Sequence, residues 1–307
     1  MSFLYWLEGL RFPLLTDFML LITHLGEKVA FLAVALVLFW CIDKRHGYYI
    51  LMVGFVGTLF NQFLKLCFRI PRPWERVSNF TAVEAAKEEA TGFSFPSGHT
   101  QNSVGTFGGI AFHTNKRWAR WLFISLCILI PISRMYLGVH TPADVLVSFA
   151  LAIVLIISIY PVVYGGNFRK RMRIALFSMV GMNIGYLLFA HLYPFPQDLN
   201  AERLASGFEA GYTLLGALAG MIIVFFVDEY WLHFPVKAKW WAQILKTALG
   251  LGVVLAVMLG LEEPICNLLG LYAGMAVHYF IVVLVAGVVW PMTFRFFAKL
   301  GVKEPCK

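Results

Sequence analysis

The chain is short of charged residues. Asp, Glu, Lys and Arg make up 14% of its 307 residues, and 60% are hydrophobic, whereas soluble domains hold about 25% charged and about 45–50% apolar residues. This composition excludes an ordinary soluble enzyme and favours an integral membrane protein. The formal net charge of +8 does not predict a nucleic-acid partner, because basic loops of membrane proteins set topology and contact anionic lipid.

Patterns that would hold a metal or form a disulfide scaffold are also missing. The five cysteines show neither metal-ligand spacing nor an obvious pairing; they are Cys41, Cys67, Cys127, Cys266 and Cys306. The chain has no His-Glu-x-x-His segment and no clustered aspartates. We therefore expect no metal and no other cofactor. We also expect no signal peptide, because charged residues interrupt the first apolar stretch and no small-residue cleavage site follows.

Long hydrophobic runs occupy most of the remaining sequence. Nine of them approach the 20 or so residues that a bilayer core requires; they lie near 25–42, 47–67, 98–114, 118–135, 142–164, 172–192, 207–228, 241–261 and 265–294. Residues 3–24 are a weaker candidate, because Glu8, Arg11 and Asp17 interrupt them, and an interfacial or re-entrant amphipathic helix is expected there. The predicted fold is an all-α polytopic transmembrane helix bundle of about nine spanning helices plus an N-terminal interfacial helix.

The charges of the connecting loops predict an orientation. If the amino terminus lies outside, the inner connections and the tail carry the basic residues Lys44, Arg45, Lys116, Arg117, Arg120, Arg169, Lys170, Arg171, Arg173, Lys237, Lys239, Lys299, Lys303 and Lys307. On the outer side, one connection holds Asp198 and Glu202 with one basic residue, Arg203, and another holds Glu262 and Glu263. This asymmetry is what the positive-inside rule requires.

Three short strings carry the chemistry, and all three fall on the outer side of this arrangement. The first is Lys65 followed by Arg72-Pro73, the second is Pro96-Ser97-Gly98-His99, and the third is Ser133-Arg134 followed by His140 and Asp144. Between the first two strings, residues 74–95 are polar and contain a run of helix formers. That stretch is either a short surface helix covering a site or a solvated connector.

The first two strings predict an anion site. Lysine supplies a point charge, and arginine supplies a planar fork that suits two phosphate oxygens. Ser97 is typical of a helix N-cap, Gly98 allows the backbone to approach a ligand, and free amides at a helix start favour an anion. Taken alone, Lys65 and Arg72 would more often be two cations at the interfacial end of a helix. Taken alone, the segment Pro96-Ser97-Gly98-His99 would more often be the start of an ordinary capped helix.

The third string predicts a nucleophile with its orienting group. His140 and Asp144 are four residues apart, so they share a helical face if His140 joins the turn. A carboxylate can hold one ring nitrogen and leave the other free to attack. His99 is a second histidine with a side chain suited to proton transfer. An isolated pair of this kind is usually structural, but ionisable groups at membrane depth are functional candidates.

These strings are similar to the three signature motifs of the type-2 phosphatidic acid phosphatase superfamily, KxxxxxxRP, PSGH and SRxxxxxHxxxD, and match them without a substitution over residues 65–144. The resemblance implies that His140 attacks phosphorus, Asp144 orients it, and His99 protonates the leaving oxygen and then activates water. It implies that phosphoryl oxygens are bound by Lys65, Arg72, Ser97, Gly98 and Arg134. The segment count with an external amino terminus also resembles glucose-6-phosphatases and sphingosine-phosphate phosphatases.

The predicted function is a metal-independent membrane phosphatase that hydrolyses a lipid phosphate or diphosphate monoester through a phosphohistidine at the non-cytoplasmic face. A soluble sugar phosphate as substrate and phosphotransfer between lipids are the alternatives, and a transporter is less favoured. Its partners would be the lipid phosphate and membrane lipids, without nucleic acid, and the oligomeric state is left open.

The membrane would be the plasma membrane in a bacterium or the endoplasmic reticulum in a eukaryote. We expect residues 1–164 to hold the N-terminal segment and catalytic core, and residues 165–307 to add four C-terminal helices.

Overall fold

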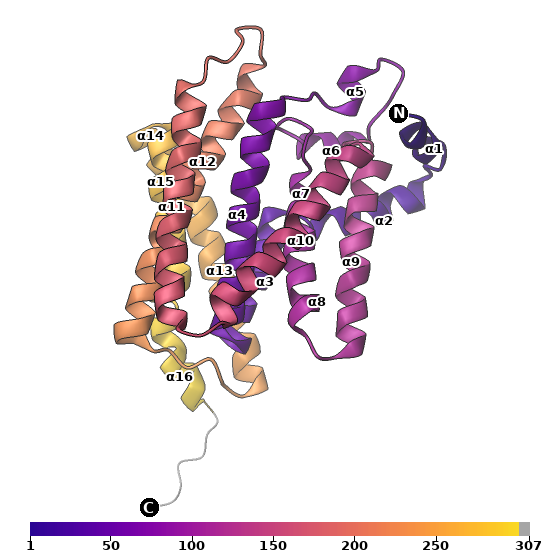
Figure 1. The fold of residues 1–307 in the computed structure, drawn as a ribbon. Helices are drawn as coiled ribbons and strands as arrows, with labels where there is room; N and C mark the ends of the chain where they lie inside the picture. The colour runs from indigo at the N-terminus through magenta and orange to yellow at the C-terminus, as the bar shows by residue number, and fades with distance from the viewer. Residues whose placement is uncertain (301–307) are drawn as a thin grey trace, which may run out of the picture. The chain divides into compact units, whose positions relative to one another are not determined.

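The computed structural model describes residues 1–300 of the chain (Figure 1). These residues form helices joined by loops and contain no strand, which confirms the all-α prediction. Cys306, Lys303 and Lys307, which entered the cysteine and charge arguments, lie outside the described residues.

The helices follow one another with short connections. Up to the end of the third motif they are α1 (Ser2–Gly9), α2 (Pro13–His24), α3 (Lys28–Val37), η1 (Leu38–Ile42), α4 (Lys44–Phe68), α5 (Pro73–Arg76), α6 (Glu84–Glu88), α7 (Gly98–Ser103), η2 (Val104–Gly108), α8 (Gly109–His113), α9 (Arg117–Tyr136) and α10 (Pro142–Tyr164). The rest are α11 (Phe168–Leu192), α12 (Ala201–Val227), η3 (Asp228–Leu232), α13 (Trp240–Gly260), α14 (Glu262–Leu269), α15 (Leu271–Leu284), η4 (Val285–Val289), η5 (Pro291–Thr293) and α16 (Phe294–Lys299).

The chain divides into two compact units. Unit 1 consists of Met1–Val34, Tyr49–Pro161 and Phe189–Phe208, and unit 2 consists of Ala35–Tyr48, Val162–Leu188 and the residues from Glu209 onward. All three motifs lie in unit 1. The expected division into residues 1–164 and 165–307 stays a prediction.

The number of spanning helices is close to the expected nine. Within residues 1–300, seven helical segments are long and apolar enough to cross a membrane. An eighth span is possible if α2 and the α3–η1 helix form one span, although they are bent by 52°, as in a broken span or a re-entrant loop. The remaining expected span, residues 98–114, is the helix running through α7, η2 and α8, which is shorter than 18 residues.

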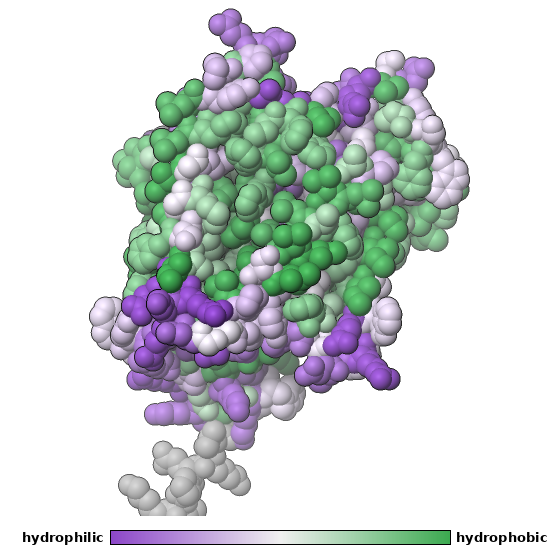
Figure 2. Space-filling view, viewed as in Figure 1, coloured by the Kyte–Doolittle hydropathy of each residue, from purple (hydrophilic) through white to green (hydrophobic). Residues whose placement is uncertain are grey.

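In unit 1, α9 and α10 present hydrophobic side chains outward. Trp118 and Trp121 on α9 are both 69% exposed, and Leu146 on α10 is 66% exposed. Figure 2 shows hydrophobic side chains along these two helices and hydrophilic ones at the turn between α8 and α9, where Lys116 and Arg117 lie. Apolar side chains exposed along a whole helix are typical of a lipid-facing surface.

In unit 2, α12 and α15 pack closely through glycine. A Cβ atom added at Gly216 would lie 1.8 Å from the backbone oxygen of Ala276, and one at Gly220 would lie 2.9 Å from Val283. Gly216 and Gly220 are four residues apart and therefore lie on one face of α12. Small residues at this spacing allow membrane helices to approach each other closely.

We expect Gly216→Ala to destabilise the protein, because the new methyl group meets backbone atoms that cannot rotate away. Overpacking of this kind costs about 1–3 kcal/mol of unfolding free energy. Gly252→Ala on α13 is the matched control, since a Cβ atom there would meet nothing within 4 Å. Thermal unfolding of the two purified variants in detergent measures the effect, and equal melting temperatures would contradict the predicted close contact.

Candidate active site

The motif residues come from the ends of four helices and the loops beside them. From the first motif, Lys65 lies in the last turn of α4 and Arg72 precedes α5. From the second motif, Ser97 caps α7, and Gly98 and His99 are its first two residues. From the third motif, Arg134 lies in the last turn of α9, His140 lies in the turn after α9, and Asp144 lies in the first turn of α10. All of these residues belong to unit 1. The chain thus gathers at one end of the unit residues that are up to 79 positions apart in the sequence, from Lys65 to Asp144.

His140 lies between a cation and a carboxylate. Its Nε2 is 2.9 Å from Arg72 Nη1, and its Nδ1 is 3.5 Å from Asp144 Oδ2. A guanidinium group only donates hydrogen bonds, so Nε2 accepts from Arg72 and carries no proton. The proton of the neutral ring is therefore assigned to Nδ1, on the side of Asp144. This tautomer leaves the Nε2 lone pair for a nucleophilic role.

The protonation of His140 agrees with this assignment. The side chain is 2% exposed. Burial, followed by the neighbouring charge of Arg72, lowers the pKa of His140 well below its ordinary range, while Asp144 acts in the opposite direction. The ring is therefore neutral at physiological pH, as a nucleophile must be.

Asp144 is held by two donors of its own. Its Oδ2 accepts hydrogen bonds from Ser94 Oγ at 2.6 Å and from the amide of Thr141 at 2.7 Å. Its backbone oxygen accepts from the amide of Ser97 at 3.1 Å, which joins the start of α10 to the start of α7. The carboxylate is therefore fixed in place beside His140. Ser94 was not identified from the sequence, although it lies two residues before the second motif.

Arg72 is buried and tied to the backbone. Its Nε donates to the carbonyl of Gly92 at 3.0 Å and its Nη1 to the carbonyl of Val139 at 3.1 Å. Its own amide donates to Glu75 Oε2 at 2.9 Å, and Pro73 occupies the first position of α5. The guanidinium group therefore has one orientation, aimed at the ring of His140.

Lys65 and Arg134 are the other two buried cations of the site, 8% and 0% exposed. Within residues 1–300, the side chains of Lys65, Arg72 and Arg134 form no ion pair with a carboxylate. Arg134 Nη1 donates to Thr23 Oγ1 at 2.8 Å, and Lys65 Nζ lies beside Gly92. Lys65 lies within electrostatic range of Arg72, Arg134 and Asp144. Unpaired buried cations are costly, so an anionic ligand would stabilise this region.

Ser97 and Gly98 begin α7 as expected. Ser97 is buried, and its Oγ accepts from the amide of Thr100 at 3.3 Å and from the Thr100 hydroxyl at 3.0 Å. The Ser97 side chain is thus an N-cap, and its part in binding phosphate stays a prediction. A Cβ atom at Gly98 would meet only Asn61 Oδ1, at 3.9 Å, so packing within the protein does not require glycine there.

His99 has a carboxylate neighbour that the motifs do not include. Its Nε2 is 3.4 Å from Glu89 Oε2 and forms no hydrogen bond with the described residues. The contact with His99 is the first of the causes that lower the pKa of Glu89 to about 2. Glu89 therefore stays ionised and faces the imidazole of His99, where it opposes the burial that lowers the pKa of His99 to about 4. The site contains two histidine–carboxylate pairs, His140 with Asp144 and His99 with Glu89.

Glu89 follows α6, the short helix that was one of the two expectations for residues 74–95. That expectation is confirmed, and the helix is anchored through Ala86 and Ala90, which pack in a core cluster with Tyr136, Leu137 and Val139. The connection therefore covers the turn between α9 and α10. The acidic run of this stretch was visible in the sequence, but nothing local indicated which of its carboxylates faces His99.

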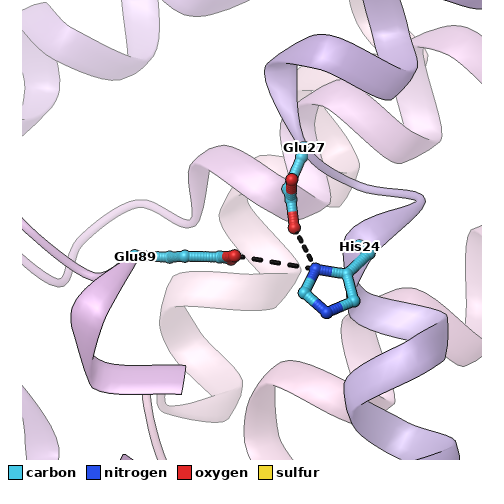
Figure 3. Close-up of side chains that lie close together, drawn as sticks. All are labelled: His24, Glu27 and Glu89. Carbon is cyan, nitrogen blue, oxygen red and sulfur yellow. Dashed lines mark hydrogen bonds and ion pairs between the residues drawn. The ribbon is translucent and has the colours of Figure 1, made fainter. Parts of the chain in front are cut away.

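Glu89 also belongs to a group that could hold a metal ion (Figure 3). The ligand atoms of His24, Glu27 and Glu89 all lie within 4.8 Å of one another. His24 Nδ1 contacts Glu27 and lies 3.6 Å from Glu89 Oε1. Burial raises the pKa of Glu27. This group is outside the three motifs, and its imidazole is half exposed.

Comparisons with known proteins point to one family. Residues 44–167 match the PAP2 superfamily, and residues 212–303 match the family described as PAP2 superfamily phosphatase, transmembrane extension. The first match includes all three motifs, and the second covers most of the region without a motif. No solved structure matches the chain.

Curated relatives agree with these matches. Phosphatidylglycerophosphatase B of Bacillus subtilis (strain 168) is 30% identical over 159 residues, which cover 48% of this chain and 74% of that protein. Undecaprenyl-diphosphatase BcrC of the same organism is 28% identical over 37% of this chain and 55% of its own length. Sphingosine-1-phosphate phosphatase 1 of Rattus norvegicus is 25% identical over 53% of this chain and 38% of its own length. The chain therefore belongs to the PAP2 superfamily of membrane phosphatases.

Proposed function

We propose that the protein hydrolyses a lipid phosphate or lipid diphosphate monoester through a phosphohistidine formed on His140. The observation that carries this proposal is the placement of His140, whose unprotonated Nε2 contacts Arg72 while Nδ1 faces Asp144. A nucleophilic lone pair and a phosphate-binding cation therefore meet at one point. Phosphoryl transfer needs little else from a protein beyond positioning and charge stabilisation.

In the first step, Nε2 of His140 attacks phosphorus. The N–P bond forms as the P–O bond to the lipid alcohol breaks, and His99 gives its proton to the departing oxygen. The Nη1 group of Arg72, which contacts Nε2 in this structure, donates to a phosphoryl oxygen instead. Asp144 stabilises the cationic ring that results, as the orienting carboxylate does in other triads.

In the second step, His99 takes a proton from water, and the hydroxide oxygen attacks phosphorus. The N–P bond breaks, inorganic phosphate leaves, and both histidines return to their starting states. Lys65, Arg72 and Arg134 offset the charge on the phosphoryl oxygens in both steps. Three buried cations without carboxylate partners can stabilise a dianion strongly, because a site with little water screens charge weakly.

Two observations support a lipid substrate. The named relatives are phosphatases of phosphatidylglycerophosphate, undecaprenyl diphosphate and sphingosine-1-phosphate. The catalytic residues also lie at the ends of apolar helices, where a phosphate headgroup would meet them while its chains stay in lipid. These observations favour a lipid over a soluble sugar phosphate.

We further propose that the site faces the non-cytoplasmic side. In unit 1 the catalytic residues occupy the end of α9 and the start of α10, whereas Lys116, Arg117 and Arg120 lie at the opposite end of α9. Basic residues collect on the cytoplasmic side of membrane proteins, so the opposite end of α9 lies outside. Reaction of Cys substituted at Asn79 with a membrane-impermeant thiol reagent in intact cells would test the orientation.

The substrate is tested with purified protein and three compounds: a lipid phosphate monoester, a polyprenyl diphosphate and a hexose phosphate. We expect phosphate release from one or both lipids at least about tenfold faster than from the sugar, by kcat/KM, because binding of the lipid chains, remote from the reacting phosphate, contributes to catalysis. Faster release from the hexose phosphate would favour the sugar-phosphate alternative. Transfer of label to an added acceptor lipid without phosphate release would favour the transferase.

The same assay with EDTA tests metal independence. We expect unchanged activity, because the three cations supply the positive charge that a metal would otherwise provide. Loss of activity in EDTA would contradict this mechanism and direct attention to His24, Glu27 and Glu89, whose ligand atoms lie close enough to share an ion.

His140→Ala should lower turnover by several powers of ten, as removal of the nucleophile does in other covalent enzymes. The direct readout is the intermediate. With labelled substrate and an alkaline quench, wild type should retain label on histidine and His140→Ala should retain none. His113→Ala is the matched control, because His113 lies at the far end of the α7–α8 helix. Label of unchanged yield in His140→Ala would overturn the assignment.

Glu89→Gln should lower kcat by about 10- to 100-fold, as loss of a residue that orients a functional histidine commonly does. Glutamine keeps the size of the side chain but cannot stabilise the protonated ring of His99. The alkaline limb of the pH–rate profile should therefore move to lower pH. The neighbouring Glu88 is exposed and forms no ion pair within residues 1–300, so Glu88→Gln is the control. A fall in kcat with an unmoved alkaline limb would show that Glu89 has only a structural role.

A further inference from the structure

Unit 2 contains a cavity that takes no part in the chemistry described above. Its volume is about 720 Å³, within the range of small-molecule sites. The first turn of α4, the start of α11 and the end of α12 with η3 supply its walls. Figure 2 shows hydrophilic side chains gathered over this end of α11 and α12.

Most of the charges that line the cavity neutralise one another. Lys44 Nζ lies 2.8 Å from both carboxylate oxygens of Asp228. Arg169 forms an ion pair with Glu229. These two pairs account for four of the six Asp, Glu, Lys and Arg side chains in the lining.

The remaining two are one cation and one anion. The guanidinium group of Arg45 stacks on the ring of Phe168, with 4.6 Å between Cζ and the ring centre, and has no carboxylate partner within residues 1–300. Among residues 1–300, the carboxylate of Asp43 accepts a hydrogen bond only from the backbone amide of Arg45, at 3.0 Å. Both side chains line the cavity, and they leave it one positive and one negative group for a ligand.

Tyr48 provides an independent sign of a missing partner. It lines the cavity and is 3% exposed, yet its hydroxyl forms no hydrogen bond with the described residues. Its ring is fixed by edge contacts with Phe39 and Phe225. A buried hydroxyl without a partner is unfavourable, so a ligand that forms a hydrogen bond with it would bind more tightly.

We propose that this cavity binds a zwitterionic headgroup that carries a phosphate and a primary ammonium. Arg45 holds the phosphate through its fork, already oriented by Phe168. Asp43 accepts hydrogen bonds from the ammonium, and the Tyr48 hydroxyl donates to a phosphate oxygen. A primary ammonium suits Asp43 because it has three donors, whereas a quaternary ammonium has none.

The surroundings favour a membrane lipid as the source of this headgroup. Ile42 is 64% exposed, and Tyr230 and Trp231 of η3 are 52% and 75% exposed. Exposed tyrosine and tryptophan beside charged residues are typical of the membrane–water interface. A free phosphoamine has the same recognition chemistry, so the experiment includes both sources. The inference does not rest on the phosphatase activity.

Native mass spectrometry of the purified full-length protein measures which lipid stays bound as the detergent concentration is raised. With equal amounts of phosphatidylethanolamine and phosphatidylcholine, we expect at least about fivefold greater retention of the ethanolamine lipid. Asp43→Asn should reduce that retention to the level of the choline lipid, whereas Arg45→Gln and Tyr48→Phe should reduce the retention of both lipids. Lys170→Gln, which removes an exposed charge outside the cavity, should leave it unchanged.

Thermal unfolding with added free phosphoethanolamine identifies the source. A rise in melting temperature that Arg45→Gln abolishes shows that the headgroup alone is bound, and lipid retention without this rise shows that the intact lipid is required. The proposal is overturned if the two lipids are retained equally, or if Arg45→Gln behaves like Lys170→Gln in both measurements.

Discussion

The three buried cations of unit 1 are the main electrostatic constraint on this protein. Lys65, Arg72 and Arg134 are each less than 10% exposed and lack carboxylate partners among the described residues. The fold tolerates them by tying Arg72 to two backbone carbonyls and Arg134 to Thr23. Burial of these cations lowers the stability of the folded protein, but it also strengthens their interaction with a phosphoryl dianion, because little water screens the charges. The buried cations therefore lie where the phosphate is proposed to bind.

The ends of the helices fix the positions of the motif side chains. Pro73 is the first residue of α5, and Ser97 caps α7. Asp144 lies in the first turn of α10, and its backbone oxygen accepts a hydrogen bond from the amide of Ser97. Each of the motif side chains therefore lies on a helix or within two residues of one. The two histidines differ in environment: His140 is buried with Asp144, whereas His99 is paired with the more exposed Glu89. In the proposed mechanism His140 is the neutral nucleophile and His99 is the acid–base group, with Glu89 opposing the burial that lowers the pKa of His99.

The sequence predicted the class of fold well and its details less well. Hydrophobic length indicated membrane helices, but it could not show that η2 interrupts the helix of residues 98–113, or that α2 and the α3–η1 helix are bent by 52°. The bend falls at residues 25–27, where Gly26 packs so closely against Ile130 that a Cβ atom would lie 2.9 Å from it, and composition does not record this contact. Ser94 and Glu89 were missed for a related reason, because their roles depend on Asp144 and His99, 50 and 10 positions away.

By itself, the sequence determined that this is an all-helical membrane protein and which residues match the family motifs, because hydrophobic runs and motif spacings are properties of local sequence. Only the tertiary structure decided which nitrogen of His140 carries no proton, since that depends on Arg72, 68 positions earlier. It also decided that Glu89 faces His99 and that Arg45 and Asp43 remain unneutralised in the cavity of unit 2. Protonation and charge balance are set by neighbours in space, and packing alone brings those neighbours together.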